Sequence, residues 1–265
     1  MIRLGCQTYS WQMTYEKHND SLDHIATVAA QAGFAGIEPE VCMLGRYRNN
    51  PMGLKTMLDS KGLTLAAITM ALPWQNATET DDERAEADYA IDFLQHFPNT
   101  MFVLCQLPGK NRDNLLARQE NAVACINTVA RRANARGLAC TFHPNSPTGS
   151  IFRTEEDYVF LLGRLDTEFV GFCPDAGHIV KGGMDLYQTL KRYKHMINHM
   201  HYKNITHTGQ WSAIDGGVIS AKELVSWLGE NGYIGWLVSE DESEYARENP
   251  DAAAVLTGRT MSSTP

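Results

Sequence analysis

Short apolar runs recur along this chain at the spacing of strand-helix repeats, and this spacing is the strongest constraint on its fold. Between the runs lie segments with helical periodicity, such as Leu22, Ile25, Ala26 and Ala29. The expected strands cover residues 3–8, 36–38, 63–69, 101–106, 138–143, 170–173, 197–203 and 236–240. Eight such units would use nearly all of the 265 residues. The sequence therefore predicts an α/β fold with parallel strands: a single (β/α)8 TIM barrel spanning residues 1–265 as one domain, with a flexible tail at 258–265.

Local signals mark where the helices should begin and end. Thr154 with Asp157 and Ser220 with Glu223 have the spacing of a capping box. Three aspartates are further candidates for the first, capping position of a helix: Asp20, Asp81 and Asp185. Four glycines suit the left-handed residue that ends a helix: Gly33, Gly62, Gly137 and Gly232. Both kinds of signal fall in phase with the predicted strands.

Composition excludes several classes of partner. With 23 basic and 31 acidic residues the formal net charge is −8, which repels a phosphate backbone, so we expect no nucleic-acid partner. No apolar run reaches the ~18 residues that span a membrane, and the N-terminus lacks an export signal, so we expect no membrane association. Six dispersed cysteines without CxxC spacing favour a reduced, cytoplasmic location. Because exposed barrel helices often form interfaces, a homodimer is one assembly to consider.

Four potential metal ligands each stand at the end of a predicted strand: His143, Asp175, His201 and Glu240. They are separated by 32, 26 and 39 residues, close to the length of one strand-helix unit. In a barrel, the carboxyl ends of the strands meet on one face, where active sites are built. Imidazole and carboxylate ligands together suit one divalent ion, with Mn²⁺ preferred and Fe²⁺, Co²⁺, Zn²⁺ or Mg²⁺ as alternatives. Taken singly, Asp175 could instead cap the next helix and His143 could be a core histidine.

Polar residues near these ligands are candidates for chemistry. His178 forms a DxxH pattern with Asp175 and could donate a proton to a leaving group. Lys203 lies two residues after His201, where its ammonium could stabilise an enolate oxygen, although a solvent-facing lysine is the alternative. Glu38 and Gln106 end the second and fourth strands and could hold substrate hydroxyls. An ion pair with Lys203 is the alternative for Glu38.

Aromatic side chains supply candidates for the wall of a sugar site. Tyr9, Trp11 and Trp211 could contact the CH face of a sugar ring, although core packing is the commoner role of such residues. His199 shares the strand face of His201 by its even spacing, whereas His195 falls at a helix end. We expect both of these histidines to be structural or surface residues.

Four segments carry a family resemblance, which extends over most of the chain and is strongest after residue 138. They read HPNSPTGSIFRTEEDYVFLL, PDAGHIVKGG, HMHYKNI and GYIGWLVSEDES. They resemble the xylose isomerase-like barrel superfamily of sugar isomerases, epimerases and dehydratases, nearest to its inosose dehydratase branch. The resemblance implies that Asp175, His201 and Glu240 take the metal positions of strands six, seven and eight. His143 stands where many isomerases and epimerases of the family have glutamate.

The resemblance and the ligand set together predict enolate chemistry on a keto sugar or keto inositol, a small sugar or polyol substrate. We expect a dehydratase-type lyase in which Glu240 or His143 removes a proton and His178 protonates the leaving hydroxyl. An isomerase or epimerase is the alternative, disfavoured because a two-glutamate epimerase would lack one base at His143. A non-catalytic sugar-binding or partner subunit is a further alternative. Barrel endonucleases acting at abasic DNA would need more metal ligands and a basic face.

Overall fold

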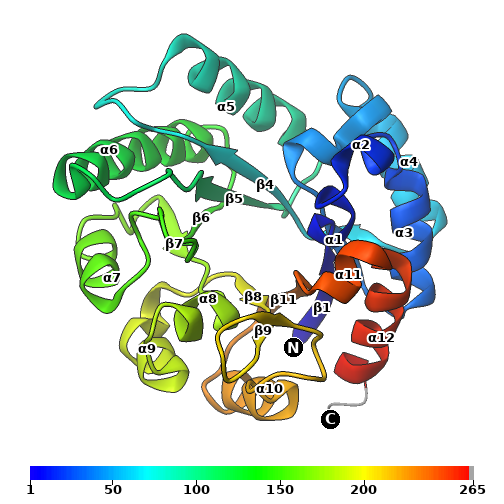
Figure 1. Ribbon diagram of the computed structural model, residues 1–265. Coiled ribbons are helices and arrows are strands. Elements are labelled where there is room, and N and C mark those ends of the chain that lie inside the picture. The colour runs from blue at the N-terminus through cyan, green and yellow to red at the C-terminus, as the bar shows by residue number, and fades with distance from the viewer. Residues whose placement is uncertain (263–265) are drawn as a thin grey trace. The chain divides into compact units, whose positions relative to one another are not determined.

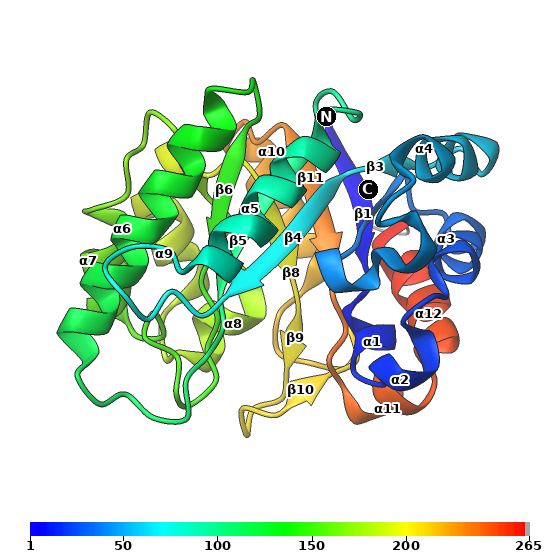
Figure 2. The ribbon, with the colours of Figure 1, turned by 90° about the horizontal axis from the view of Figure 1, so that it is seen from above.

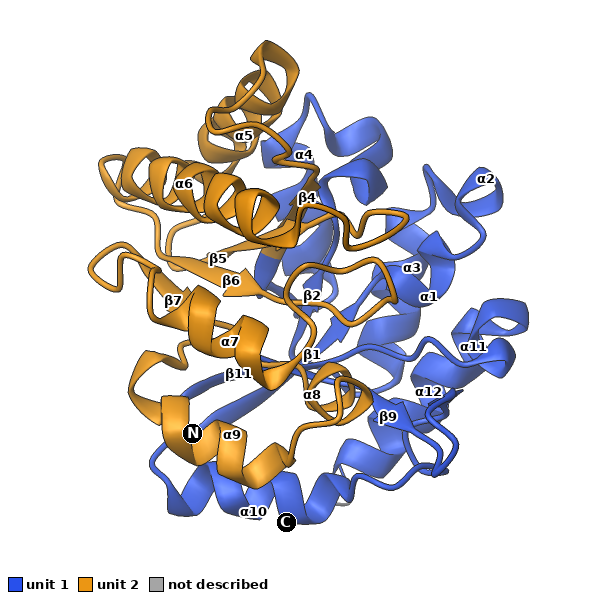
Figure 3. Cartoon of the chain, turned by 60° about the vertical axis from the view of Figure 1, so that its left-hand side comes forward, with its two compact units in different colours: residues 1–67, 200–265 blue, residues 68–199 orange. Residues whose placement is uncertain are grey.

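The computed structural model describes residues 1–262 of the chain, and strands alternate with helices along it (Figure 1). The chain divides into two compact units, distinguished by colour in Figure 3. Unit 1 comprises residues 1–67 and 200–265, and unit 2 comprises residues 68–199. Each unit has its own sheet and its own covering helices, and each is described separately.

Unit 1 is built on a five-stranded sheet of order β3-β2-β1-β11-β8 in which every neighbouring pair runs parallel. Its strands are β1 (Ile2–Gln7), β2 (Gly36–Glu38), β3 (Thr64–Leu65), β8 (Met200–Tyr202) and β11 (Gly235–Ser239), with an antiparallel hairpin of β9 (Asn204–Ile205) and β10 (Trp211–Ser212). Its helices are α1 (Tyr9–Gln12), α2 (Tyr15–His18), α3 (Leu22–Gln31), η1 (Val41–Tyr47), α4 (Pro51–Ser60), α10 (Ala221–Glu230), α11 (Glu244–Glu248) and α12 (Pro250–Ser262). Gln7 pairs with Glu38 and Val238 with His201, so these strands end at a common edge.

The ring of Trp236 packs directly against the backbone of Gly36 in unit 1. A Cβ atom on Gly36 would lie 2.5 Å from Cη2 of Trp236 and 2.8 Å from the carbonyl oxygen of Thr64. The Arg3 guanidinium lies 4.0 Å from the centroid of the same ring. Glycine at position 36 is therefore required by space, because any side chain there would displace the ring or the neighbouring strand.

Unit 2 contains a four-stranded sheet of order β4-β5-β6-β7, in which β5, β6 and β7 run parallel. The strands are β4 (Ala67–Leu72, whose first residue belongs to unit 1), β5 (Met101–Gln106), β6 (Cys140–His143) and β7 (Val170–Phe172). The helices are α5 (Asp81–Leu94), α6 (Leu115–Asn134), α7 (Glu155–Leu162), α8 (Ala176–Lys181), α9 (Leu186–Tyr193) and η2 (Lys194–Met196). Helices α5 and α6 cover one face of the sheet (Figure 2). Cys105 pairs with His143, which aligns the carboxyl ends of β5 and β6.

Most of the predicted helix boundaries are confirmed. Thr154 and Asp157 form a complete capping box on α7, and Asp185 caps α9. The four glycines predicted to end helices all have positive φ, between +69° and +88°. Two predicted caps are wrong. Thr80 rather than Asp81 caps α5. Ser21 rather than Asp20 holds the N-cap position of α3, and Oδ1 of Asp20 instead accepts a hydrogen bond from the Arg46 amide at 2.8 Å.

The predicted strands agree closely with the observed ones, with two differences. Residues 63–69 divide into β3 and the start of β4, and residues 197–203 contain only the short β8. Residues 258–262, where the sequence predicts a flexible tail, continue α12; residues 263–265 lie outside the described part. A Cβ atom on Gly258 would lie 2.1 Å from the carbonyl oxygen of Ala32, so α12 packs tightly at this point. Within residues 1–262, no helix combines the length and apolar character needed to cross a bilayer.

Candidate metal and substrate site

His143 and Asp175 lie together at the carboxyl ends of β6 and β7 in unit 2. His143 is the last residue of β6, and Asp175 follows β7 as the capping residue of α8. Oδ1 of Asp175 accepts a hydrogen bond from the His178 amide at 2.9 Å, and Oδ2 lies 3.5 Å from Nε2 of His143. Both side chains are buried. The capping role considered for Asp175 thus engages one oxygen, while the other faces the imidazole.

The spacing between these two side chains fits a pair of metal ligands. It exceeds the ~2.7–3.2 Å of a typical N–H···O hydrogen bond. Two donors that each lie about 2.1 Å from one ion, at a tetrahedral angle, are about 3.4 Å apart. The separation of 3.5 Å between Nε2 of His143 and Oδ2 of Asp175 therefore suits two ligands that share an ion.

His178 is held in one orientation by the segment that follows β6. Its Nδ1 accepts hydrogen bonds from the Ser146 amide at 3.1 Å and from the Ser146 hydroxyl at 2.7 Å. Because Nδ1 accepts, the proton of the neutral ring lies on Nε2. His178 is 3% exposed, and its ring packs edge to face against the ring of His143, with the two centroids 5.4 Å apart. The ring is therefore set to donate from Nε2.

Two amide side chains lie in the same part of unit 2. Gln106, the last residue of β5, donates to the Pro73 carbonyl at 3.1 Å. Asn145 donates to the Gln106 carbonyl at 2.6 Å. Within residues 1–262, Oε1 of Gln106 and Oδ1 of Asn145 are buried oxygens without a hydrogen-bond partner. Buried acceptors of this kind suit the hydroxyl groups of a polyol ligand.

In unit 1, the imidazole of His201 lies between two carboxylates. Its Nε2 lies 2.7 Å from Oε1 of Glu38, a hydrogen bond between two fully buried groups. Its Nδ1 lies 3.4 Å from Oε2 of Glu240, the spacing of two co-ligands. Metal-binding histidines commonly donate their second ring nitrogen to a carboxylate, which fixes the ring. Glu38 is thus positioned to orient His201, with Nδ1 turned toward Glu240.

Lys203 extends the same group of charges. Its ammonium lies 2.8 Å from Oε1 of Glu240 and also contacts Glu242. The rings of Tyr9 and Trp211 flank it, with centroids 5.7 Å and 5.6 Å from Nζ. Lys203 is buried rather than exposed to solvent, which removes the solvent-facing alternative.

Two further side chains of unit 1 differ in their placement. Burial raises the pKa of Glu40 to about 7; a hydrogen bond from Gln12 opposes the shift, and the charge of Glu240 adds to it. Trp11 is fully buried, and its indole donates to Asp251 of α12 at 2.7 Å. This environment favours a packing role for Trp11, whereas Tyr9 and Trp211 stay beside Lys203.

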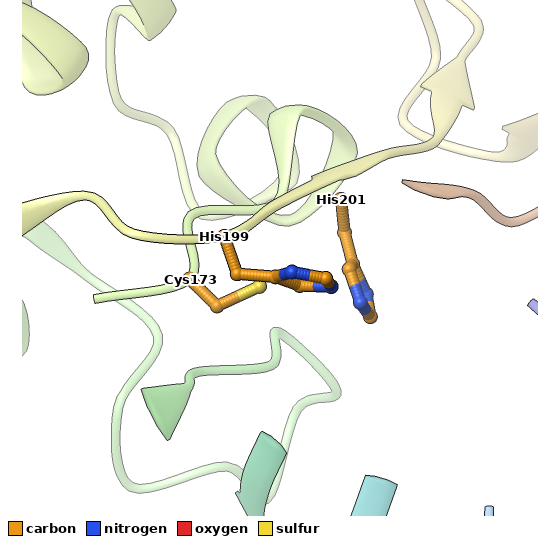
Figure 4. Close-up of side chains that lie close together, drawn as sticks. All are labelled: Cys173, His199 and His201. Carbon is orange, nitrogen blue, oxygen red and sulfur yellow. The ribbon is translucent and has the colours of Figure 1, made fainter. Parts of the chain in front are cut away.

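Cys173 and His199 form a second pair of potential ligands in unit 2 (Figure 4). Sγ of Cys173 and a ring nitrogen of His199 lie within 4.8 Å of each other, and both residues are fully buried. His201 follows His199 by two residues and projects from the same side of the chain, as the even spacing predicts (Figure 4). His195, in contrast, is exposed.

Several contacts around these groups were not predicted from the sequence. Ser146, Asn145 and Glu242 each bind a predicted site residue or its neighbour. Ser146 and Asn145 directly follow the HP pair that ends β6, and Glu242 belongs to the acidic SEDE run. Polar residues within three positions of a strand end are the signal that could have identified all three.

A family model described as Xylose isomerase-like TIM barrel matches residues 26–259. The chain belongs to this family. The predicted (β/α)8 fold class and the predicted superfamily are thereby confirmed. Among curated relatives, the inosose dehydratase of Lacticaseibacillus casei is 24% identical over an alignment 308 positions long, which covers 99% of this chain and 97% of that protein.

Two solved structures are similar to this fold. The IOLI protein with a binding zinc atom has a TM-score of 0.77 at 15% identity, covering 100% of this chain and 99% of that one. The D-psicose 3-epimerase of Clostridium cellulolyticum H10, solved with D-tagatose, has a TM-score of 0.76 at 16% identity, with 99% of each chain covered. At these identities the likeness concerns the fold alone.

Proposed function

We propose that this xylose isomerase-like protein is a divalent-metal-dependent enzyme that forms an enolate from a keto sugar or keto inositol and acts as a dehydratase-type lyase. One observation carries the proposal: each unit holds a buried imidazole-carboxylate pair with the spacing of two co-ligands. These pairs are His143 with Asp175 and His201 with Glu240. Inosose dehydratases among the relatives support the reaction class.

The metal ligands in this proposal are His143, Asp175, His201 and Glu240. In a (β/α)8 barrel the carboxyl ends of all strands open on one face, so the fold class favours convergence of the two pairs on one ion. The zinc atom named for the IOLI protein supports a metal in this family. We prefer Mn²⁺ because the set mixes nitrogen and oxygen donors. When bound, a divalent ion would polarise the substrate carbonyl and increase the acidity of the neighbouring carbon.

Residues of the chain would then move the protons. Glu240 or His143 is the proposed base, and the Lys203 ammonium lies 2.8 Å from Oε1 of Glu240. Lys203 could also stabilise the enolate oxygen. His178 donates a hydrogen bond from Nε2 to the leaving hydroxyl, since Nδ1 accepts from Ser146. Gln106 and Asn145 accept hydrogen bonds from substrate hydroxyls, and Tyr9 and Trp211 contact the sugar face.

Elimination is preferred over epimerisation because of the residue at position 143. An epimerase that exchanges a proton on both faces of one carbon needs two bases. Here an imidazole with Nε2 turned toward Asp175 replaces the glutamate expected from the family. With a single carboxylate base, loss of a β-hydroxyl completes the reaction without a second proton acceptor.

Proton NMR in D₂O tests the proposal directly. The purified chain with Mn²⁺ would be incubated with 2-keto-inositol and with a 3-keto-glucoside, and deuterium uptake and loss of water would be followed together. We expect deuterium uptake at the carbon α to the carbonyl in the remaining substrate, accompanied by loss of water to an unsaturated product. Uptake without water loss would indicate an isomerase or epimerase. Absence of both, with ligand still bound, would contradict enzymatic function and favour a binding subunit.

A matched pair of variants isolates the metal ligand from the helix cap. Asp175→Asn keeps an oxygen that can cap α8 but removes the carboxylate charge. Asp185→Asn makes the same change at the cap of α9. We expect the first to lose bound metal and deuterium uptake and the second to retain both. Wild-type levels of bound metal and deuterium uptake in Asp175→Asn would refute Asp175 as a ligand.

A further inference from the structure

Lys203 is the one lysine or arginine side chain that is buried within residues 1–262. Its ammonium contacts two carboxylates at once, Glu240 and Glu242, whose side chains are 5% and 16% exposed. Two oxygen acceptors and two flanking rings surround the ammonium, so its charge is already compensated by the protein.

Negative charge predominates around Lys203 in unit 1. Glu38 and Glu240 flank His201, Glu242 contacts the ammonium, and Glu40 is close enough to interact with Glu38, Glu240 and Lys203. Four carboxyl groups therefore share one ammonium and one imidazole. At the ammonium itself, an anionic substituent would meet the carboxylate of Glu242, which is not one of the proposed metal ligands.

Within unit 2, residues 68–199, no lysine or arginine side chain is buried. The polar side chains at the ends of β5 and β6 are the amides Gln106 and Asn145 and the imidazole of His143. The guanidinium of Arg112, in the loop after β5, forms a bidentate pair with Asp157 at 2.8 Å and 2.9 Å. It also donates to the Ser150 carbonyl at 2.7 Å. This cation is thus bound to the capping box of α7.

We propose that Glu242 is a specificity-determining residue that saturates Lys203, so that the site accepts neutral polyhydroxy ketones and rejects analogues bearing a phosphate or carboxylate. The inference rests on the proposed function only in placing the substrate beside Lys203. Glu242 acts through the lysine: with its carboxylate present, an anionic group gains no net partner there. With the carboxylate removed, Lys203 loses one of its two carboxylate contacts and can pair with an anion.

Calorimetric binding to the purified chain with Mn²⁺ tests this, using a 3-keto-glucoside and its 6-phosphate as a pair that differs by one charged group. We expect the neutral ligand to bind at least tenfold more tightly to the wild-type chain. Glu242→Gln should lower the ratio of the two dissociation constants, phosphate over neutral ligand, by about tenfold, mainly because the phosphate binds more tightly. Glu242→Asp, which keeps the charge, should retain most of the wild-type preference.

Glu244→Gln is the matched control. It makes the same charge change two residues further on, at an exposed carboxylate that pairs with Arg247. We expect its ratio to equal that of the wild type. Wild-type binding of the phosphate as tightly as the neutral ligand, or an unchanged ratio in Glu242→Gln, would overturn the inference. Selective binding without deuterium uptake would instead refute the enolate chemistry while leaving the specificity role intact.

Discussion

Replacement of Glu38 by glutamine tests how the protein holds His201, one of the proposed metal ligands. Glu38 ends β2 and binds Nε2 of His201 at 2.7 Å, while Nδ1 of the same ring faces Glu240 at 3.4 Å. Glutamine can still accept from Nε2 through its amide oxygen, so ring orientation should persist. The negative charge that makes the imidazole a better electron donor is lost. The change therefore separates electrostatic support from geometry.

The expected magnitude follows from the role of such outer partners. Loss of a carboxylate that orients a metal-binding histidine typically weakens metal binding by about 10–100-fold, or ~1.4–2.7 kcal/mol. The retained hydrogen bond limits the effect on folding to about 1 kcal/mol. Glu38→Gln should thus bind Mn²⁺ or Zn²⁺ at least tenfold more weakly while unfolding nearly as the wild type does.

Competition of the purified chain with a metal-sensitive chelator measures this affinity, and urea unfolding in the metal-free state gives the stability. Glu83→Gln is the control, because Glu83 is also a buried carboxylate but accepts from the backbone amides of Trp74 and Thr80. It should lose stability and keep metal affinity. Unchanged metal affinity in Glu38→Gln would refute the assignment of Glu38 as the support of His201.

Three further predictions concern stability. Burial opposes ionisation of Asp157, but hydrogen bonds from Arg112 and two backbone amides lower its pKa. Asp157→Asn should lower the free energy of unfolding by about 2–4 kcal/mol at pH 7. The difference from the wild type should shrink as the pH falls below ~3.8, the ordinary pKa, toward the lower pKa of Asp157 in the folded state. Gly62→Ala should cost about 1 kcal/mol in thermal unfolding, since φ is +69° and no atom lies within 4 Å of the added Cβ; a loss above ~2 kcal/mol would indicate a clash instead. Burial raises the pKa of Glu40 from 4.5 to about 7, so the folded state keeps this proton to a higher pH than the unfolded state does. The free energy of unfolding of the wild type should therefore decrease as the pH rises from 4.5 to about 7. Glu40→Gln, measured in chelator, should remove this pH dependence and be more stable than the wild type by ~1–2 kcal/mol at pH 8.

The sequence predicted the parts of the structure that depend on neighbours along the chain. Gly33 and Gly62 end helices because only a residue tolerant of positive φ can turn there, and Thr154 caps α7 through a bond three residues away. Strand-end positions for His143 and Glu240 followed from the apolar runs. These signals are local, so periodicity and residue type were sufficient to locate them.

Contacts made across the fold were not accessible in the same way. The two oxygens of Asp175 divide between a helix cap and His143, and the DxxH pattern fits either role alone. Glu242 reaches Lys203 from 39 residues away, and no sequence spacing distinguishes it from a solvated carboxylate. Tertiary packing decides such pairings, so the sequence could suggest candidate ligands but not the partners that contact them.

Crystals grown with Mn²⁺ and measured at the manganese absorption edge test the central claim most directly. We predict one anomalous peak about 2.0–2.3 Å from Nε2 of His143, Oδ2 of Asp175, Nδ1 of His201 and Oε2 of Glu240. A peak at Cys173 and His199 instead, or no peak within the reach of these four side chains, would contradict it.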